Sequence, residues 1–334
     1  MEYRKIQKIG GSSYSITLPK EWIQRNNLRE GSTVFIEITE FNDLLVKARR
    51  EVESIENEYV IDYREGYGFD YLLRKIISIY LSGVNRIIIR SSSIFSDEVR
   101  RAVEKSKELL IGIEVIEEST NEIILQDLSK IEELPMQKMI SRLLFMGESM
   151  VRDAGKSIME NDNLLARDVI GRDLQIDRIY HLIAKQFYLA LKFPDILSHI
   201  DLDILKAFNI RTIAKNVERI CDHAEKIASL VIEENGLIME EDIKEKINEL
   251  FSETVQIFSN ASRAYMKVDE YLANSTISRV NRMCDDITEW MKEIRIKNTY
   301  YIFRIAEDLT RIARYSSDIC ETTINEITMR GKFI

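Results

Sequence analysis

The sequence predicts a mainly α-helical protein, in which two tandem three-helix bundles follow a small β domain and a small α/β domain. Three observations support this fold class. Glycine and proline are scarce, at 12 and 3 of 334 residues, which favours long uninterrupted helices. Apolar residues recur at helical spacing from residue 135 onward, whereas near the N-terminus they alternate with polar residues. The length of the chain allows several domains, each able to bury a core.

Residues 1 to 50 have the pattern of a small β domain. Alternating residues in SSYSITLP predict a strand through Leu18, Pro19 begins a short helix, and Gly31 forms a turn before a second strand. A further strand follows in FNDLLVKA. So small a unit lacks the area for a core of its own, so we expect it to dimerise. Its nine basic and six acidic residues make it positive in a chain of net charge −9, so any attraction to nucleic acid must come from this end.

The stretches KIGGSSYSITLPKEW and LREGSTVFIEI contain a turn, strand, proline, helix and strand entry in that order. In this respect the segment resembles the AbrB/MazE/SpoVT family of DNA-binding β domains. The resemblance implies a homodimer in which two chains interlock into a swapped β-barrel with basic residues facing DNA. These residues would be Arg4, Lys5, Lys8 and Lys20. The alternative is that these side chains are merely solvated and the barrel serves only to dimerise.

Residues 56 to 130 have the pattern of a small α/β domain. The strand-like runs EYVIDY and RIIIR alternate with the helical patterns FDYLLRKIISIYL and SDEVRRAVEKSKELL, and IEVIEES with NEIILQDL predicts a final hairpin. This alternation indicates parallel pairing of strands. Ser91 to Ser93 follow a strand and precede a helix, a position that can bind an anion. Serine-rich loops and serine caps are, however, common without any ligand.

The helical region divides into two similar halves, residues 135 to 236 and residues 237 to 334. Each half contains three stretches of helical spacing, and the sequence ENG separates the halves. The third helices align with an offset of 92 residues, which matches Val217, Ile220, Ala224 and Ile227 with Leu309, Ile312, Ser316 and Ile319. We therefore expect a tandem repeat of a three-helix bundle.

Two acidic pairs in the first half have the spacing of neighbours on a helix. Glu218 and Asp222 are four residues apart, as are Asp173 and Asp177 upstream. Residues four apart lie on one face of a helix, so two adjacent helices can bring four carboxylates together. Such a group suits iron, manganese or magnesium. With 56 acidic residues in the chain, about nine such pairs would arise by chance, so the spacing alone does not identify a site.

The sequences VERICDHAEKIA and RDLQIDRIYHLI occur together with the duplicated three-helix layout over about 200 residues. In this combination the chain resembles the PhoU family of phosphate-uptake regulators, whose E(D)xxxD motifs lie on two helices of each bundle and bind metal clusters. The resemblance implies that Asp173, Asp177, Glu218 and Asp222 are metal ligands in the first bundle. The alternative is that these acids form the solvated edge of ordinary amphipathic helices.

The second half departs from this motif. The offset of 92 residues places Thr310 and Arg314 where the third helix of the first half has its two acids. A cation would meet a positive charge there, so we expect this bundle to hold no metal. Asp285 and Glu289 still form an acidic pair on the second helix, and we expect Arg311 or Arg314 to form an ion pair with it in place of a metal.

These features predict a cytoplasmic regulator that is not an enzyme. The chain has no apparent secretion leader, no charge-free stretch of membrane-spanning length, and no nucleophile beside a base or cofactor cradle. Its three cysteines lie too far apart for a paired zinc or disulfide motif. The PhoU resemblance implies control of phosphate uptake, with a phosphate transporter or its signalling components as partners, and the AbrB resemblance adds DNA.

Two alternatives belong to other functional classes. In the first, the protein is an adaptor that docks on a phosphate ABC transporter and dimerises through a β domain that does not bind DNA. In the second, the carboxylates belong to a metal store or a metal-dependent enzyme. DNA-binding assays separate the first alternative from a transcriptional regulator, and elemental analysis followed by activity screening addresses the second.

Overall fold

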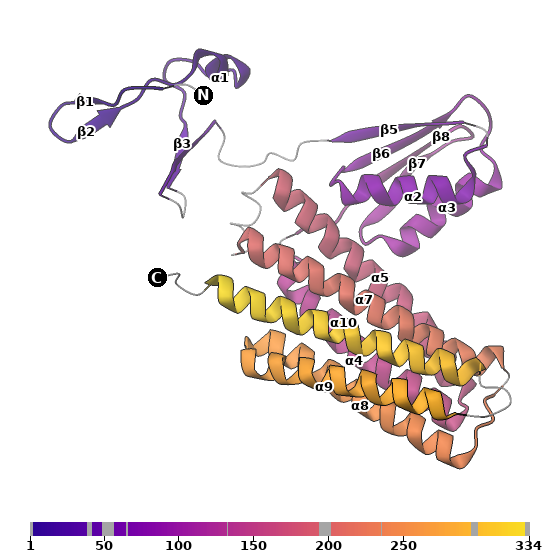
Figure 1. The fold of residues 1–334 in the computed structure, drawn as a ribbon. Coiled ribbons are helices and arrows are strands. Elements are labelled where there is room, and N and C mark those ends of the chain that lie inside the picture. The colour runs from indigo at the N-terminus through magenta and orange to yellow at the C-terminus, as the bar shows by residue number, and fades with distance from the viewer. Residues whose placement is uncertain are drawn as a thin grey trace. The chain divides into compact units, whose positions relative to one another are not determined.

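The structure, a computed structural model, describes most of the chain, namely residues 3–38, 42–48, 57–64, 66–131, 133–193, 202–234, 236–294 and 300–330. The chain divides into two compact units, Met1–Ile55 and Glu56–Ile334. The larger unit contains the α/β region and all of the long helices (Figure 1). Within the described residues, no helix combines the length and the apolar character needed to cross a membrane.

The N-terminal unit consists of two antiparallel hairpins and a short helix. Its elements are β1 (Gln7–Ile9), β2 (Ser13–Ser15), α1 (Lys20–Arg25), β3 (Phe35–Ile38) and β4 (Leu44–Lys47). Pro19 is the N-cap of α1, as predicted. The prediction of a strand through Leu18 was wrong, because β2 pairs only with the three residues of β1 and ends at Ser15 with its partner.

The α/β region is a four-stranded sheet with two helices. Its elements are β5 (Glu58–Tyr63), α2 (Gly68–Leu81), β6 (Arg86–Ser91), α3 (Asp97–Leu109), β7 (Ile113–Glu118) and β8 (Glu122–Asp127), and the strand order is β5-β6-β8-β7. Strands β5 and β6 run parallel, as predicted. Strand β8 runs antiparallel to β6, because it returns from a hairpin with β7 and not through a helical crossover. Helices α2 and α3 pack against each other and against helix α5 of the adjoining bundle.

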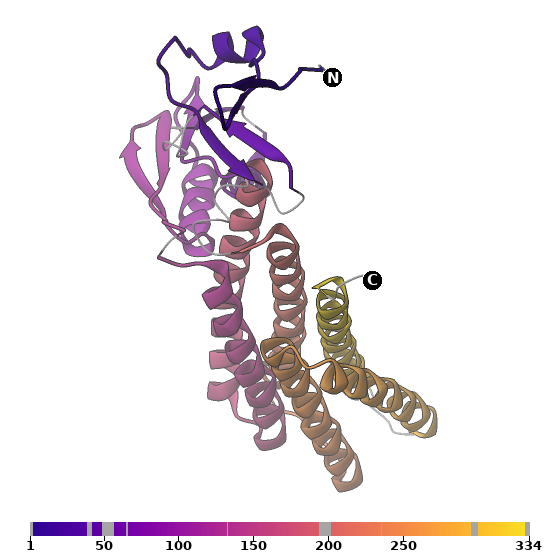
Figure 2. The same ribbon diagram turned by 90° about the vertical axis from the view of Figure 1, so that its left-hand side faces the viewer.

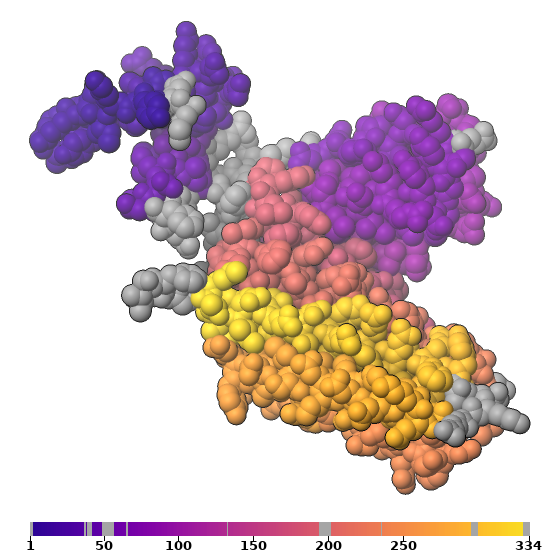
Figure 3. Space-filling view, in the orientation of Figure 1, coloured from indigo at the N-terminus to yellow at the C-terminus, as the bar shows by residue number. Residues whose placement is uncertain are grey.

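The helical region is a tandem pair of three-helix bundles. The first contains α4 (Met136–Glu160), α5 (Asn163–Lys192) and α7 (Ile204–Glu233), and the second contains α8 (Glu241–Lys267), α9 (Glu270–Glu293) and α10 (Tyr300–Arg330). Figure 2 shows the helices of the first bundle running side by side. Helix α10 of the second bundle packs against α7 of the first bundle on one side and against α9 on the other (Figure 3).

The first and second helices of the two bundles are joined in the same way. Asn161 and Val268 end α4 and α8 in the left-handed conformation, and Asp162 and Asp269 cap the following helices by accepting hydrogen bonds from backbone N–H groups. Both pairs are separated by 107 residues. The third helices retain the offset of 92 residues, and every residue of the matched apolar stripes is fully buried. The predicted tandem repeat is therefore confirmed.

Candidate metal centre

Four carboxylates of the first bundle gather where α5 packs against α7. Asp173 and Asp177 come from α5, and Glu218 and Asp222 come from α7. Asp173, Asp177 and Asp222 are half-buried, and each offers an oxygen within 4.8 Å of the others. In the described part of the chain, no other cluster of potential metal ligands meets this spacing. The structure thus brings three of the four predicted residues together at this spacing, and Glu218 is close enough to act on the charge of Asp177.

Glu218 borders this cluster and is held by a neighbouring lysine. Its side chain is buried, and its Oε1 accepts a hydrogen bond from Lys215 Nζ at 2.6 Å. The same Nζ lies 4.8 Å from the centre of the Tyr180 ring. Lys215 was not among the residues predicted for the site, although a lysine three residues before a glutamate on a helix is a common ion-pair partner. In the metal-free protein, Lys215 therefore supplies the positive charge nearest to the cluster on α7.

The four carboxylates are arranged so that their ionised forms repel one another. Burial, and then the charge of Asp177, raises the pKa of Asp173 to about 7. Burial, and then the charge of Glu218, raises the pKa of Asp177 to about 6. Burial also raises the pKa of Glu218. Such shifts indicate that the cluster retains protons near neutral pH unless a cation takes their place.

Two oxygen atoms at this position have no hydrogen-bond partner among the described residues. They are Oδ1 of Asp173 and Oε2 of Glu218, and both are buried. A buried acceptor without a partner costs about 1–3 kcal/mol, and a bound cation would remove this cost. Because all donors are carboxylate oxygens, the cluster suits magnesium, manganese or iron better than a thiolate-seeking metal. A cation bound there would neutralise the carboxylates and connect α5 to α7.

The corresponding position in the second bundle has a different chemistry. The 107-residue offset relates Asp173 and Asp177 to Val280 and Cys284, and the 92-residue offset relates Glu218 and Asp222 to Thr310 and Arg314. Arg314 is near enough to the Cys284 thiol to oppose the rise in the pKa of that thiol. A valine, a thiol, a hydroxyl and a guanidinium thus stand where the first bundle has four carboxylates.

Asp285 and Glu289, the acidic pair of the second bundle, lie on the exposed face of α9. Asp285 and Glu289 each come one residue after a position that faces α10. One residue turns the side chain by about 100° around the helix axis, so neither acid faces α10. Arg311 lies 3.9 Å from Glu307 of its own helix. Arg314 contacts the thiol of Cys284. We expected Arg311 or Arg314 to form an ion pair with Asp285 and Glu289. The structure instead places Arg311 beside Glu307 and Arg314 beside Cys284.

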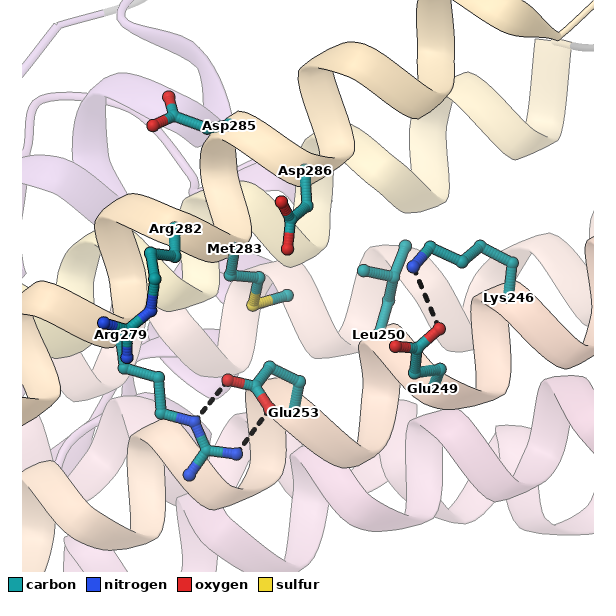
Figure 4. A pocket seen from close by; sticks show the side chains of 9 residues that line it. All are labelled: Lys246, Glu249, Leu250, Glu253, Arg279, Arg282, Met283, Asp285 and Asp286. Atoms are coloured by element: carbon teal, nitrogen blue, oxygen red, sulfur yellow. Dashed lines mark hydrogen bonds and ion pairs between the residues drawn. The ribbon is translucent and has the colours of Figure 1, made fainter.

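A pocket of about 360 Å³ lies between α8 and α9, and Asp285 is one of the residues that line it (Figure 4). Glu253 binds Arg279 through both carboxylate oxygens, and Lys246 donates to Glu249 at 2.9 Å. Asp285 stands at its edge with the carboxylate directed away from the other side chains drawn. Because Glu249 and Glu253 are paired with bases and Arg282 adds a further positive charge, this pocket is a weaker cation site than the cluster of the first bundle.

The N-terminal unit displays both predicted features of its surface. Arg4, Lys5, Lys8 and Lys20 are exposed. None of the unit's described residues is buried, and large apolar side chains are exposed instead: Ile6, Ile9, Tyr14, Ile16, Ile36, Ile38, Leu44 and Leu45. Apolar exposure of this extent is typical of a surface that another chain covers. Binding of DNA and pairing with a second copy both stay predictions.

The serine loop after β6 is held by bonds within itself and by bonds to Thr120 and Asn121 in the turn between β7 and β8. The Ser91 hydroxyl accepts a hydrogen bond from the Ser93 backbone N–H at 3.1 Å. Ser96 is the N-cap of α3, but its side chain makes no capping hydrogen bond. The anion site proposed for Ser91 to Ser93 stays a prediction.

Models of two known protein families match the chain, one in the N-terminal unit and one in the first helical bundle. The PhoU domain model matches residues 140–231, a range that includes α5, most of α7 and all four carboxylates. This part of the chain is thus similar to PhoU domains. A second model, described as antidote-toxin recognition MazE, bacterial antitoxin, matches residues 7–53. Both resemblances read from the sequence are therefore confirmed, and the metal candidates lie within the PhoU domain.

Relatives of the PhoU domain occur among characterised proteins and solved structures. The chain is 27% identical over 205 residues to the phosphate-specific transport system accessory protein PhoU homolog 1 of Thermotoga maritima, a match that covers 55% of this chain and 82% of the relative. The crystal structure of PhoU from Pseudomonas aeruginosa is 21% identical, with a TM-score of 0.48, and covers 59% of this chain and 98% of its own. The phosphate transport system regulatory protein PhoU from Streptococcus pneumoniae is 19% identical, with a TM-score of 0.43, and covers 61% and 100%.

Proposed function

We propose that this protein regulates phosphate uptake from the cytoplasm, binding a divalent or trivalent cation in its PhoU domain and DNA through a dimer of its N-terminal unit. The observation that carries the proposal is the half-buried carboxylate cluster in a PhoU domain that follows a MazE-like unit in the same chain. Its partners would be a phosphate transporter or the signalling components of that transporter. In this role the protein is a regulator and not an enzyme.

The metal part of the proposal rests on charge and unsatisfied oxygen atoms. Asp222 raises the cost of ionising Asp173 and Asp177, and two buried oxygens at the cluster have no partner among the described residues. A cation relieves both conditions. Asp173, Asp177, Glu218 and Asp222 would hold it, and Glu218 would exchange Lys215 for the metal. The metal would thereby fix the packing of α5 against α7.

The DNA part rests on the surface of the N-terminal unit. Basic residues at four exposed positions and a positive balance over residues 1 to 50 favour contact with phosphate groups. The exposed apolar strands support a dimer, which would double the number of basic residues that face one DNA duplex. A regulator of this design would pass phosphate status to transcription without a separate sensor kinase.

An electrophoretic mobility shift with DNA from the protein's own promoter region tests this function. We expect a shift at about 50 mM salt that weakens strongly at about 200 mM salt, because phosphate contacts release counterions. The double variant Lys5→Gln/Lys8→Gln should lose the shift. The matched variant Lys156→Gln/Lys246→Gln removes the same charge from α4 and α8 and should retain it.

Loss of the shift in both double variants would show that DNA binding depends only on net charge. Absence of a shift at low salt would contradict a role as a DNA-binding transcriptional regulator. In the latter case the adaptor that docks on a phosphate transporter becomes the better account. The exposed apolar strands would then serve dimerisation alone.

A further inference from the structure

The second bundle has an open pocket beside the place that corresponds to the carboxylate cluster. The pocket lies between α9 and α10 and has a volume of about 670 Å³. Its position follows from the repeat, since it contains Thr310 and Arg314, the counterparts of Glu218 and Asp222. Its volume falls within the range of about 300–1,000 Å³ that is usual for small-molecule sites.

The charged residues of this pocket are mostly basic. Lys292 comes from α9, Arg311 and Arg314 come from α10, and Glu307 is the one carboxylate in the lining. Glu307 lies 3.9 Å from Arg311, with both side chains exposed. An exposed pair of this kind is weak, so a stronger anion can displace it. The acidic pair Asp285 and Glu289 does not line this pocket.

The two arginines lie one turn of α10 apart, and one of them is oriented by a neighbour. Arg314 lies near the thiol of Cys284, the counterpart of Asp177. Burial raises the pKa of that thiol, and the charge of Arg314 opposes the rise. The thiol therefore acts as a neutral partner that leaves the charge of Arg314 uncompensated. Guanidinium groups are well suited to bind phosphate oxygens in pairs.

Apolar side chains form the rest of the pocket. Ile287 and Ala306 are buried at its floor, and Met291 is half-buried. The ring of Phe303 is 47% exposed. An inorganic ion would leave this apolar area in water. A ligand with both an anionic group and a flat apolar group would use both parts of the pocket.

We propose that the pocket between α9 and α10 binds a small organic phosphate, with the phosphate group on Arg311, Arg314 and Lys292 and the apolar group against Phe303 and Met291. A nucleotide has this chemistry. The proposal does not depend on a metal in the first bundle or on DNA binding. It assigns the duplicated bundles different ligands, a cation in the first and an anion in the second.

Isothermal titration calorimetry of the full chain with ATP, in the presence of EDTA, tests the proposal. EDTA removes divalent cations and so prevents ATP from binding through a metal at the carboxylate cluster. We expect saturable binding that Arg311→Ala and Arg314→Ala each weaken by about tenfold or more. Phe303→Ala should weaken the binding of ATP and leave that of inorganic phosphate unchanged.

Arg282→Ala provides the matched control, because Arg282 lies on the other side of α9 in the pocket of Figure 4. It removes the same charge from the same bundle and should leave ATP binding intact. Circular dichroism confirms that each variant remains helical. The change of Trp22→Phe leaves Trp290 of α9 as the single tryptophan, whose fluorescence gives a second readout of binding.

Binding of ATP that is lost in Arg311→Ala and Arg314→Ala and retained in Arg282→Ala supports the proposal. The proposal is overturned if ATP does not bind saturably in EDTA, or if all three arginine variants weaken it equally. Inorganic phosphate that binds as tightly as ATP also overturns it, because the apolar wall would then contribute nothing.

Discussion

Lys185 of α5 and Asp127 of β8 form an ion pair that is buried between the first bundle and the α/β region. Their side chains are only 5% and 2% exposed. Lys185 Nζ also donates to Ser129 Oγ at 2.8 Å and lies 4.7 Å from the centre of the Tyr80 ring. Lys185 follows Asp177 by about two turns of the same helix. The pair therefore joins the helix that carries two of the metal candidates to the sheet of the α/β region.

Replacement of Lys185 by methionine should lower the free energy of unfolding by about 3–5 kcal/mol, because it leaves a buried carboxylate without its partner. Urea unfolding followed by circular dichroism measures this loss. Lys192→Met is the matched control, since Lys192 is on the same helix and donates one exposed hydrogen bond to the Ser82 carbonyl. Its cost should be about 1 kcal/mol or less. Equal losses in the two variants would contradict a special role of the buried pair.

The metal-free protein should lose stability as the pH rises from about 4 to about 7. The pKa values of Asp173 and Asp177 are raised to about 7 and about 6, from 3.8 for the ordinary group. Between these limits the folded state binds more protons than the unfolded state, so the free energy of unfolding falls with increasing pH. The contribution is complete below about pH 4. Solvent screening reduces it to the order of 1–3 kcal/mol.

Urea unfolding in EDTA at pH 5 and pH 8 measures this difference. The double variant Asp173→Asn/Asp177→Asn should show a smaller difference between the two values. A pH dependence that is the same in this variant and in the native chain would place its origin outside the cluster.

Removal of Lys215 should strengthen cation binding. Its ammonium group occupies an oxygen of Glu218 at 2.6 Å, and a metal must displace it to use that oxygen. At pH 8 we expect Lys215→Met to tighten the binding of Mn²⁺ by roughly tenfold, as a competing charge is removed. Lys226→Met, an exposed position on the same helix, serves as control and should change the affinity less. Unchanged affinity in Lys215→Met would mean that Glu218 does not bind the metal.

Dimerisation through the N-terminal unit should depend on its exposed strands. Ile36 and Ile38 of β3 are 62% and 69% exposed, and a lysine at each position would place charges in the proposed interface. We expect Ile36→Lys/Ile38→Lys to reduce the mass measured by light scattering from two chains to one. Ile94→Lys, at an apolar position of the α/β region that is 76% exposed, should leave the dimer intact. A double variant that stays dimeric would move the interface elsewhere.

Local features of the fold were predictable because each depends on a few neighbouring residues. Pro19 predicts the start of α1 and is the N-cap of that helix. The apolar stripe around Val217 predicts its own burial, since helical periodicity alone decides which side chains face the core. Asp173, Asp177 and the acids of α7 come together because adjacent helices in a bundle must place corresponding faces against each other.

Contacts between distant segments were not predictable in the same way. The spacing of Asp285 and Glu289 is the same as that of the metal candidates, but their register relative to Cys284 turns them toward solvent. Only the cap residues Asp162 and Asp269 reveal the register that relates the second helices. The pairing of Lys185 with Asp127 requires knowledge of how the sheet packs on α5, which neither segment encodes alone.

Metal content measured by elemental analysis, after equilibration with Mn²⁺ and removal of free ions, tests the central claim most directly. The native chain should retain manganese, and Asp173→Asn/Glu218→Gln should lose it. Asp285→Asn/Glu289→Gln removes the same two charges from the exposed acidic pair of the second bundle and should retain the native amount. Equal metal content in the native chain and in Asp173→Asn/Glu218→Gln would contradict the assignment of the carboxylate cluster as a metal site.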